Sequence, residues 1–361
     1  MFKVKNKNLL QKFGLARTII ALFLIALFIA APFAGVSIKD SFENVLSRFG
    51  MFSILVLSLV PMVQSGCGLN FGIPIGVVCG ILGGVTSIEF GYVGYMGLFM
   101  AMVFAILFSI FFGAIYGYVL NKIMGDEMLI ATYVGYSFTS FMCIAYLLLP
   151  YKNPVSVLSY GGTGLRQQIP VANYWMKQVI GNSGNKMTMG LISKFLSFNI
   201  GGVHVPIGMF LLFAFFAFLV WSFFKTKTGT AMTAVGSNPE YARASGINIS
   251  RVRFVSVILS TAIASVGIIV YQQSYGFIQL YQAPLAFTFQ TVAALLIGGA
   301  SINKATIPHV IIGTFLFQGI ITLTPTVING AFNIDISEIL RIIVTNGMIL
   351  YALTRRNKVN E

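Results

Sequence analysis

The stretch AVGSNPEYARASGIN, residues 234–248, is unlike the chain on either side of it. It is polar, whereas the 361-residue chain as a whole is 57% hydrophobic and only 9% charged. Ser237 and Glu240 have the spacing of a capping box, in which each side chain binds a free backbone N–H at the start of a helix. Pro239 suits the first turn, and Gly246 suits a left-handed residue that ends the helix. The stretch predicts a short, capped, water-facing helix between long apolar segments.

Apolar segments make up most of the remaining chain. The segments without any Asp, Glu, Lys or Arg are 18–38, 49–88, 90–121, 128–151, 195–224, 254–303 and 305–334. About 20 apolar residues suffice to cross a membrane as a helix. The runs 49–88 and 254–303 are too long for one crossing, and they contain the Gly- and Pro-bearing breaks SGCGLNFGIP (65–74) and YGFIQLYQAP (275–284). With a last segment near 337–354, we expect an all-α polytopic membrane protein with about ten transmembrane helices.

Basic residues account for a net charge of +14, and they are clustered. The clusters are Lys3, Lys5, Lys7, Lys12 and Arg17 before the first span, Lys225, Lys227, Arg243, Arg251 and Arg253 around the polar helix, and Arg355, Arg356 and Lys358 near the end. Lys and Arg accumulate on cytoplasmic loops. We expect one transmembrane domain, 1–361. An even number of spans places both of its termini and the loop 225–253 on the cytoplasmic side. The basic excess therefore indicates topology and not a nucleic-acid surface.

The segment 151–200 also carries basic residues without any acid, yet the same parity places it outside as a long external loop. Long loops report orientation less well than short ones. Two interpretations remain open. The segment is either a solvated loop or a basic docking surface for an acidic soluble partner.

The sequence offers no source of energy for transport and no catalytic constellation. Of its acids, only Glu89 is flanked on both sides by long apolar runs, whereas ion-driven transporters keep ionisable residues at membrane depth. It contains no G-x-x-x-x-G-K-[ST] phosphate-binding loop. His204 and His309 are isolated, and the three cysteines lie in apolar segments without metal-ligand spacing. We expect no enzyme activity, cofactor or metal, but a pathway driven by a separate subunit.

The polar helix is suited to helix-in-groove docking, although a solvated loop helix would show the same spacing. The segment GTAMTAVGSNPEYARASGINISRVRFVSVILST (229–261) resembles the cytoplasmic loop of permease subunits of bacterial ABC importers. It is most similar to the ribose/galactose-type simple-sugar permeases, whose superfamily includes branched-chain amino-acid permeases. The pattern is matched at Gly229, Ala234, Gly236, Asn238, Ala242, Ser245, Gly246, Ile247 and Asn248. The resemblance implies that 234–248 is the coupling helix for the ATPase subunit, through Gly236, Ser237, Asn238, Glu240, Tyr241, Ala242, Ser245 and Gly246.

Three further stretches follow the order of that family. They are GCGLNFGIPIG (66–76), where Asn70 and Phe71 replace an aspartate and a serine, GAIYGYVLNKIMGDEMLIATYVG (113–135) and TVAALLIGGAS (291–301). The chain departs from the family after the last one, where Ile302-Asn303-Lys304-Ala305 replaces further glycines, and in its long 151–200 segment.

Glycines and neutral polar residues near these stretches could line a pathway for a neutral, hydroxylated solute. Glycines can break a helix and let backbone groups face a cavity, or can simply permit close helix packing. The pathway residues we expect are Gln64, Gly68, Asn70, Gly72, Thr132, Gln290, Thr291 and Ser301.

The resemblance therefore implies a permease subunit of a bacterial inner-membrane ABC importer with both termini cytoplasmic. Its partners would be an ATPase, an external solute-binding protein and a second permease, either itself or a paralogue, within membrane lipid. The solute would be a small neutral molecule such as a monosaccharide. Nucleosides or branched-chain amino acids are alternatives, and a stand-alone channel for small solutes is a more distant one.

Overall fold

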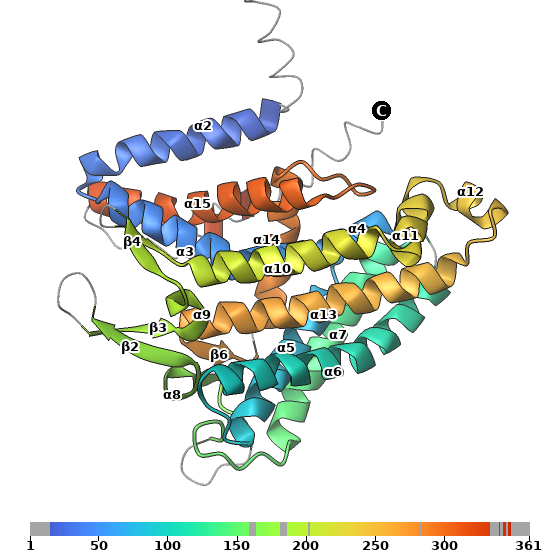
Figure 1. The fold of residues 1–361 in the computed structure, drawn as a ribbon, viewed down its shortest axis with the longest axis horizontal. Helices are drawn as coiled ribbons and strands as arrows, with labels where there is room; N and C mark the ends of the chain where they lie inside the picture. The colour runs from blue at the N-terminus through green and yellow to red at the C-terminus, as the bar shows by residue number, and fades with distance from the viewer. Residues whose placement is uncertain are drawn as a thin grey trace, which may run out of the picture.

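The protein is an all-helical bundle with short strands at one end (Figure 1). The computed structural model describes residues 15–332 except 124, 159–163, 181–185, 201–202 and 282, with a few isolated positions beyond. The helices are α2 (Leu15–Ala30), η1 (Pro32–Ala34), α3 (Ile38–Leu57), α4 (Leu59–Gln64), α5 (Ile73–Glu89), α6 (Gly94–Lys122), α7 (Glu127–Leu148), α8 (Ala172–Trp175), α9 (Leu191–Lys194), α10 (Ile207–Phe224), α11 (Lys227–Ser237), α12 (Pro239–Ala244), α13 (Ile249–Tyr275), α14 (Ala283–Ile297) and α15 (Ile307–Phe332). The strands are β1 (Gln168–Pro170), β2 (Met176–Ile180), β3 (Lys186–Gly190), β4 (Phe198–Ile200), β5 (Val203–Val205) and β6 (Phe277–Gln279).

Six helical segments of the described residues are long and apolar enough to cross a membrane, counting α3 and α4 as one. Three shorter apolar helices, α2, α5 and α14, coincide with further predicted spans. The all-α polytopic architecture is thus confirmed. The last predicted span, 337–354, lies almost wholly outside the described residues.

Helices α5 and α13 form the centre of the bundle. Every residue of α5 from Ile73 to Ile88 is buried, because its glycines let neighbouring helices approach closely. A Cβ added at Gly76 would lie 2.7 Å from Cβ of Ala264 on α13, and one at Gly80 would overlap Ile268. Large apolar side chains instead point outward from α6, α7 and α10, as expected of helices that face lipid; examples are Phe99, Leu107, Phe111, Tyr133, Phe141, Ile144, Leu211, Phe215 and Phe218.

The polar helix and the 151–205 region lie at opposite ends of the bundle, with α10 running between them (Figure 1). The segment 151–205 contains short strands and helices rather than an unstructured loop. Its strand β1 pairs antiparallel with β6, and Trp175 on α8 is fully buried beside Gly84 of α5. We call residues 151–205 the cap.

Both predicted breaks are present. Residues 65–72 separate α4 from α5, and residues 276–282 separate α13 from α14 and contain β6. We call them the first break and the second break.

Candidate functional site

The polar stretch forms two helices, α11 and α12, rather than one. The capping box between Ser237 and Glu240 is wrong. The N-cap of α12 is Asn238, whose side-chain Oδ1 accepts from the backbone N–H of Tyr241 at 3.0 Å. Ser237 is the last residue of α11, and its hydroxyl donates to the carbonyl of Thr233 at 2.8 Å. The start of the helix lies one residue later because asparagine is as good an N-cap as serine and is followed directly by proline.

The end of α12 is as the sequence predicts. Gly246 has a φ of +79°, in the left-handed region. Its N–H donates to the carbonyl of Arg243, and the N–H of Ile247 donates to that of Ala242, both at 3.0 Å. This hydrogen-bond pair is a Schellman motif, which satisfies two carbonyls that the helix leaves free. The short helix is therefore closed at both ends by its own residues.

One face of α12 is packed and the other is open. Ala242 is 0% exposed and lies in a small cluster with Met232, Val235, Ile249 and Val252 from α11 and α13. On the outer face, Tyr241 is 70% exposed, and Glu240 and Ser245 are exposed beside it. The surface ion pair between Glu240 and Arg243, at 3.5 Å, is exposed and stabilises the helix only slightly. Ala242 thus holds α12 on the protein, and Tyr241 is left exposed on the outer face.

Helix α11 packs directly on the first break. A Cβ at Gly236 would collide with the Gln64 carbonyl, and it would lie 3.1 Å from the Gly66 nitrogen. No residue other than glycine allows this approach without a shift. The last turn of α11 therefore touches the end of α4, where the predicted pathway begins.

The first break is held by a buried asparagine. Asn70 is 1% exposed. Its Oδ1 accepts from the N–H of Gly72 at 2.8 Å and from the hydroxyl of Tyr116 at 2.9 Å, and its Nδ2 donates to Ser260 at 2.9 Å. Gly66 and Gly68 have φ of +73° and +74°, so the chain turns twice through the left-handed region. The break is therefore a defined structure that joins α5, α6 and α13.

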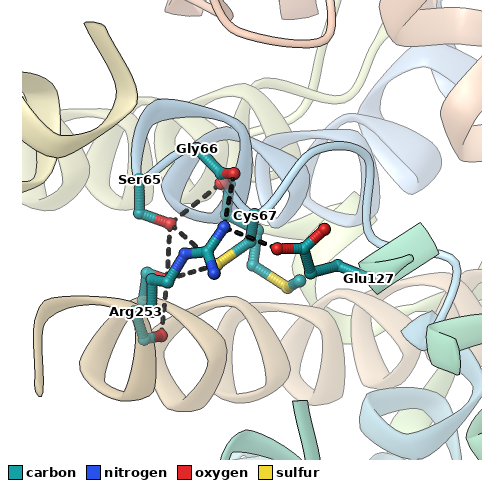
Figure 2. A network of polar contacts seen from close by, with 7 residues as sticks. Ser65, Gly66, Cys67, Glu127 and Arg253 are labelled. Atoms are coloured by element: carbon teal, nitrogen blue, oxygen red, sulfur yellow. Dashed lines mark hydrogen bonds and ion pairs between the residues drawn. The ribbon is translucent and has the colours of Figure 1, made fainter. Parts of the chain in front are cut away.

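A buried arginine joins the break to two further elements (Figure 2). Nη2 of Arg253, in the second turn of α13, donates to the Gly66 carbonyl at 3.0 Å and lies 2.7 Å from Glu127 at the start of α7. The two charged side chains are only 12% and 15% exposed. Beside them, the hydroxyls of Ser65 and Ser256 are 2.7 Å apart. The guanidinium satisfies a carbonyl that the break leaves without a helical partner.

Six of the eight predicted pathway residues fall into two groups. Gln64, Gly68 and Ser301 lie at the α12 end of the bundle, since the Gln64 amide donates to the Ala305 carbonyl and a Cβ at Gly68 would lie 3.6 Å from Ile302. Asn70, Gly72 and Thr291 are buried, and the Thr291 hydroxyl donates within its own helix. Thr132 and Gln290 are partly buried on α7 and α14. The first break brings members of both groups together, whereas Thr291 bonds only to its own helix.

Sequence analysis missed Arg253, Glu127, Tyr116 and Ser260 as parts of this site. Arg253 was counted only as one of the basic residues of the loop. Two signals were present: an arginine directly before the apolar run 254–303, and an acid directly before the run 128–151. Charged residues that border apolar spans are costly unless they are paired. Among the described residues, no group of His, Cys, Asp or Glu could hold a metal ion.

This arrangement defines a multi-pass membrane protein. It has apolar spans, a capped polar helix at one end, and a first break in the interior that α11 contacts. Residues 41–353 match the family described as "Branched-chain amino acid transport system / permease component". The chain belongs to this family of ABC transporter permeases.

Curated relatives agree with the family. The chain is 29% identical over 185 residues to the autoinducer 2 import system permease protein LsrC of Enterobacter sp. (strain 638), covering 49% of this chain and 53% of the relative. It is 29% identical over 149 residues to the probable ABC transporter permease protein YphD of Escherichia coli (strain K12), covering 41% and 43%. A match to LsrC of Shigella flexneri has 33% identity over 86 residues, 24% of this chain and 25% of the relative. The chain thus aligns with about half, or less, of the curated relatives it matches.

Proposed function

We propose that the chain is the permease subunit of a bacterial ABC importer, in which α12 docks in a groove of a separate ATPase and drives the first break. The observation that carries this is the contact of Gly236 with Gln64 and Gly66, because it links the helix pair α11–α12 to the break without any flexible segment. Exposed Tyr241 would fill a pocket of the ATPase, as an anchor residue does in helix-in-groove complexes.

Movement of α12 would reach the interior by two routes. Towards α4, it passes through α11 and Gly236. Towards α13, it passes through the cluster of Ala242, Ile249 and Val252, which ties α12 to the first turn of that helix. Since both routes converge on residues 65–72, a rigid displacement of α12 would change the width of the bundle at this end. Transport subunits use such rigid-body coupling to expose a site alternately to the two sides.

The orientation we propose rests on the basic residues of the loop 225–253. The loop 225–253 would face the cytoplasm with both termini, and the cap at the opposite end would face outside, where a solute-binding protein delivers the solute. The solute would be a small neutral molecule, with monosaccharides and autoinducer 2 the first to test; autoinducer 2 is in the name of the relative LsrC. A second permease, identical or paralogous, would complete the pathway.

Co-purification tests the central claim. A tagged chain is purified from its native membranes in mild detergent, and ATP hydrolysis in the eluate is measured for the wild type and for Tyr241→Asp. We expect hydrolysis to co-elute with the wild type and to fall about tenfold or more with the variant, since loss of a buried aromatic anchor costs on the order of 2 kcal/mol. Phe218→Asn, an exposed change on α10, serves as the control.

Liposomes containing the purified chain test the channel alternative. Uptake of labelled ribose, galactose, nucleosides and leucine is compared with and without the co-purified ATPase, binding protein and ATP. Uptake by the chain alone, without nucleotide, would contradict the proposal and favour a channel.

A further inference from the structure

We propose that Arg253 is a positioning residue that clamps the first break and the start of α7 onto α13, and that this clamp keeps the α12 end of the pathway closed. The inference deepens the proposed function and rests on it for what the opening serves. Its basis is one guanidinium nitrogen that contacts the Gly66 carbonyl and the Glu127 carboxylate at the same time (Figure 2).

The clamp ties the start of α7 to α13, and on the first break it adds to the bonds between Ser65 and Ser256 and between Asn70 and Ser260. Gly66 and Glu127 are 187 and 126 positions away from Arg253 in the sequence. The Gly66 carbonyl cannot be satisfied within α4, because the left-handed turn at Gly66 takes the chain out of the helix. Removal of the guanidinium would leave this carbonyl and a nearly buried carboxylate without their partner, which weakens the attachment of the break and of α7 to α13.

The ion pair of Arg253 and Glu127 is placed where a movement of α12 would reach it. Arg253 lies five residues after Asn248, which caps α13 directly after the α12 turn. The intervening residues Ile249 and Val252 pack in the same cluster as Ala242 of α12. A shift of α12 therefore moves the first turns of α13, and with them the guanidinium, relative to Gly66 and Glu127.

The guanidinium is only partly satisfied, which suits a contact that must break. Its Nε is buried and has no hydrogen-bond partner among the described residues, while one nitrogen, Nη2, makes both contacts. A bidentate arginine–carboxylate pair would be stronger and more fixed. With one donor unused, the arginine can exchange partners when α13 moves.

The surface pair of Arg243 and Glu240 is the natural comparison, because it has the same chemistry at 3.5 Å in solvent. Exposed pairs contribute little to stability, whereas loss of one partner of a buried pair leaves an uncompensated charge. Neutralisation of Arg253 or Glu127 should thus have a large effect on the clamp, whereas neutralisation of Arg243 or Glu240 should have little effect on stability.

Cys67 provides a probe within the break itself. It is buried, and its sulfur lies 3.4 Å from the Ser65 hydroxyl and 3.9 Å from that of Ser256. The full chain in detergent is treated with N-ethylmaleimide, and modification of Cys67 is followed over time by peptide mass spectrometry. Arg253→Gln should speed modification roughly ten- to a hundredfold, because the buried pair no longer opposes local opening. Loss of a neighbouring positive charge disfavours the reactive thiolate, so a faster reaction reports opening and not activation of the thiol.

Three further variants make the test specific. Glu127→Gln, which keeps the size of the side chain, should also accelerate modification of Cys67. The reversed pair Arg253→Glu with Glu127→Arg should be at least about threefold slower than either single reversal, because the attraction is restored. The matched control is Arg251→Gln, an exposed arginine two residues away on the same helix, which should leave the rate unchanged.

Cys79 in the centre of α5 is the internal reference for global unfolding. Faster modification of Cys67 without faster modification of Cys79 supports the clamp. Unchanged modification in Arg253→Gln, parallel acceleration of Cys79, or no recovery in the reversed pair would each overturn it. The experiment needs neither ATPase nor solute, so it tests the clamp separately from the proposed function. The clamp can be contradicted while the proposed function stands, and the proposed function can be contradicted while the clamp stands.

Discussion

The two breaks interrupt apolar runs of similar length and similar composition, but they are held in different ways. The first break is held by hydrogen bonds of side chains: Asn70 bonds Tyr116 and Ser260, and Arg253 donates to the Gly66 carbonyl. In the second break, most bonds are made by the backbone, through the ladder between β6 and β1 and the bond from the Val171 N–H to the Gly276 carbonyl, with one side-chain bond from the Tyr281 hydroxyl to the Leu165 carbonyl. The first is next to the helix pair α11–α12, and the second is covered by the cap.

This difference indicates which break can move. A backbone ladder is lost only when a strand separates, whereas side-chain bonds can be exchanged one at a time. We infer that the first break is the variable part of the pathway and that the second break with its cap is a fixed frame.

The largest effect should come from Asn70→Ala. The change removes the partner of the Gly72 N–H, the Tyr116 hydroxyl and the Ser260 hydroxyl, all of which are buried. The Gly72 N–H and the Tyr116 hydroxyl lose their acceptor, and the Ser260 oxygen loses a donor. Buried polar groups without partners cost about 1–3 kcal/mol each, so the loss in stability should be about 3 kcal/mol. Thermal unfolding in detergent, with Cys67 modification at low temperature, measures it. Asn121→Ala, which removes one exposed hydrogen bond to Ser250, is the control and should have little effect. Similar melting temperatures of Asn70→Ala and Asn121→Ala would show that Asn70 does not hold the first break. The proposed difference between the two breaks would then be lost.

A cavity at the second break should affect the cap and not the first break. Ile278 is 0% exposed and lies against Gly84. Ile278→Ala should cost about 2 kcal/mol or more, because deletion of a buried isoleucine leaves a void beside α5. Limited proteolysis within the cap should become faster, while the rate of Cys67 modification stays that of the wild type. If Cys67 responds as strongly as the cap, the two breaks move together and the fixed-frame interpretation is wrong.

Two left-handed glycines allow a finer comparison. A Cβ at Gly66 would lie 3.1 Å from Cα of Gly236, whereas one at Gly246 would meet nothing within 4 Å. Both Gly→Ala changes cost about 1 kcal/mol of backbone strain, since alanine resists this conformation. Gly66→Ala should cost more because of the contact with Gly236, and it alone should lower the melting temperature of the bundle. Equal melting temperatures would show that α11 is not tightly seated on the break.

Much of this architecture could be predicted from the sequence, because burial in lipid forces long apolar runs and glycine is needed where the chain turns out of a helix. The breaks at 65–74 and 275–284 and the left-handed Gly246 are examples. The partners of those breaks could not be predicted. That Arg253 faces Glu127 depends on the rotation of α13 against α7, and local spacing carries no information on it. The cap could not be predicted either, since β1 pairs with a strand more than a hundred residues later.

The smallest effect concerns the start of α12, where one residue separates the sequence interpretation from the structure. Asn238 is the N-cap, and Ser237 bonds backwards into α11. Asn238→Ala should therefore destabilise α12 by about 1 kcal/mol, which is a several-fold increase in its open population. A six-residue helix has little stability of its own, so this loss should expose the peptide bond after Arg243, an exposed residue within it. Trypsin cleavage at that bond, followed by mass spectrometry, should become roughly fivefold faster in Asn238→Ala and stay near the wild-type rate in Ser237→Ala. The rest of the bundle should melt at the wild-type temperature in both variants. The reverse order of cleavage rates would restore the capping box and contradict the structure at this position. Equal rates would mean that α12 is held only by Ala242 and its cluster. Coupling would then depend on this packing rather than on the N-cap residue Asn238.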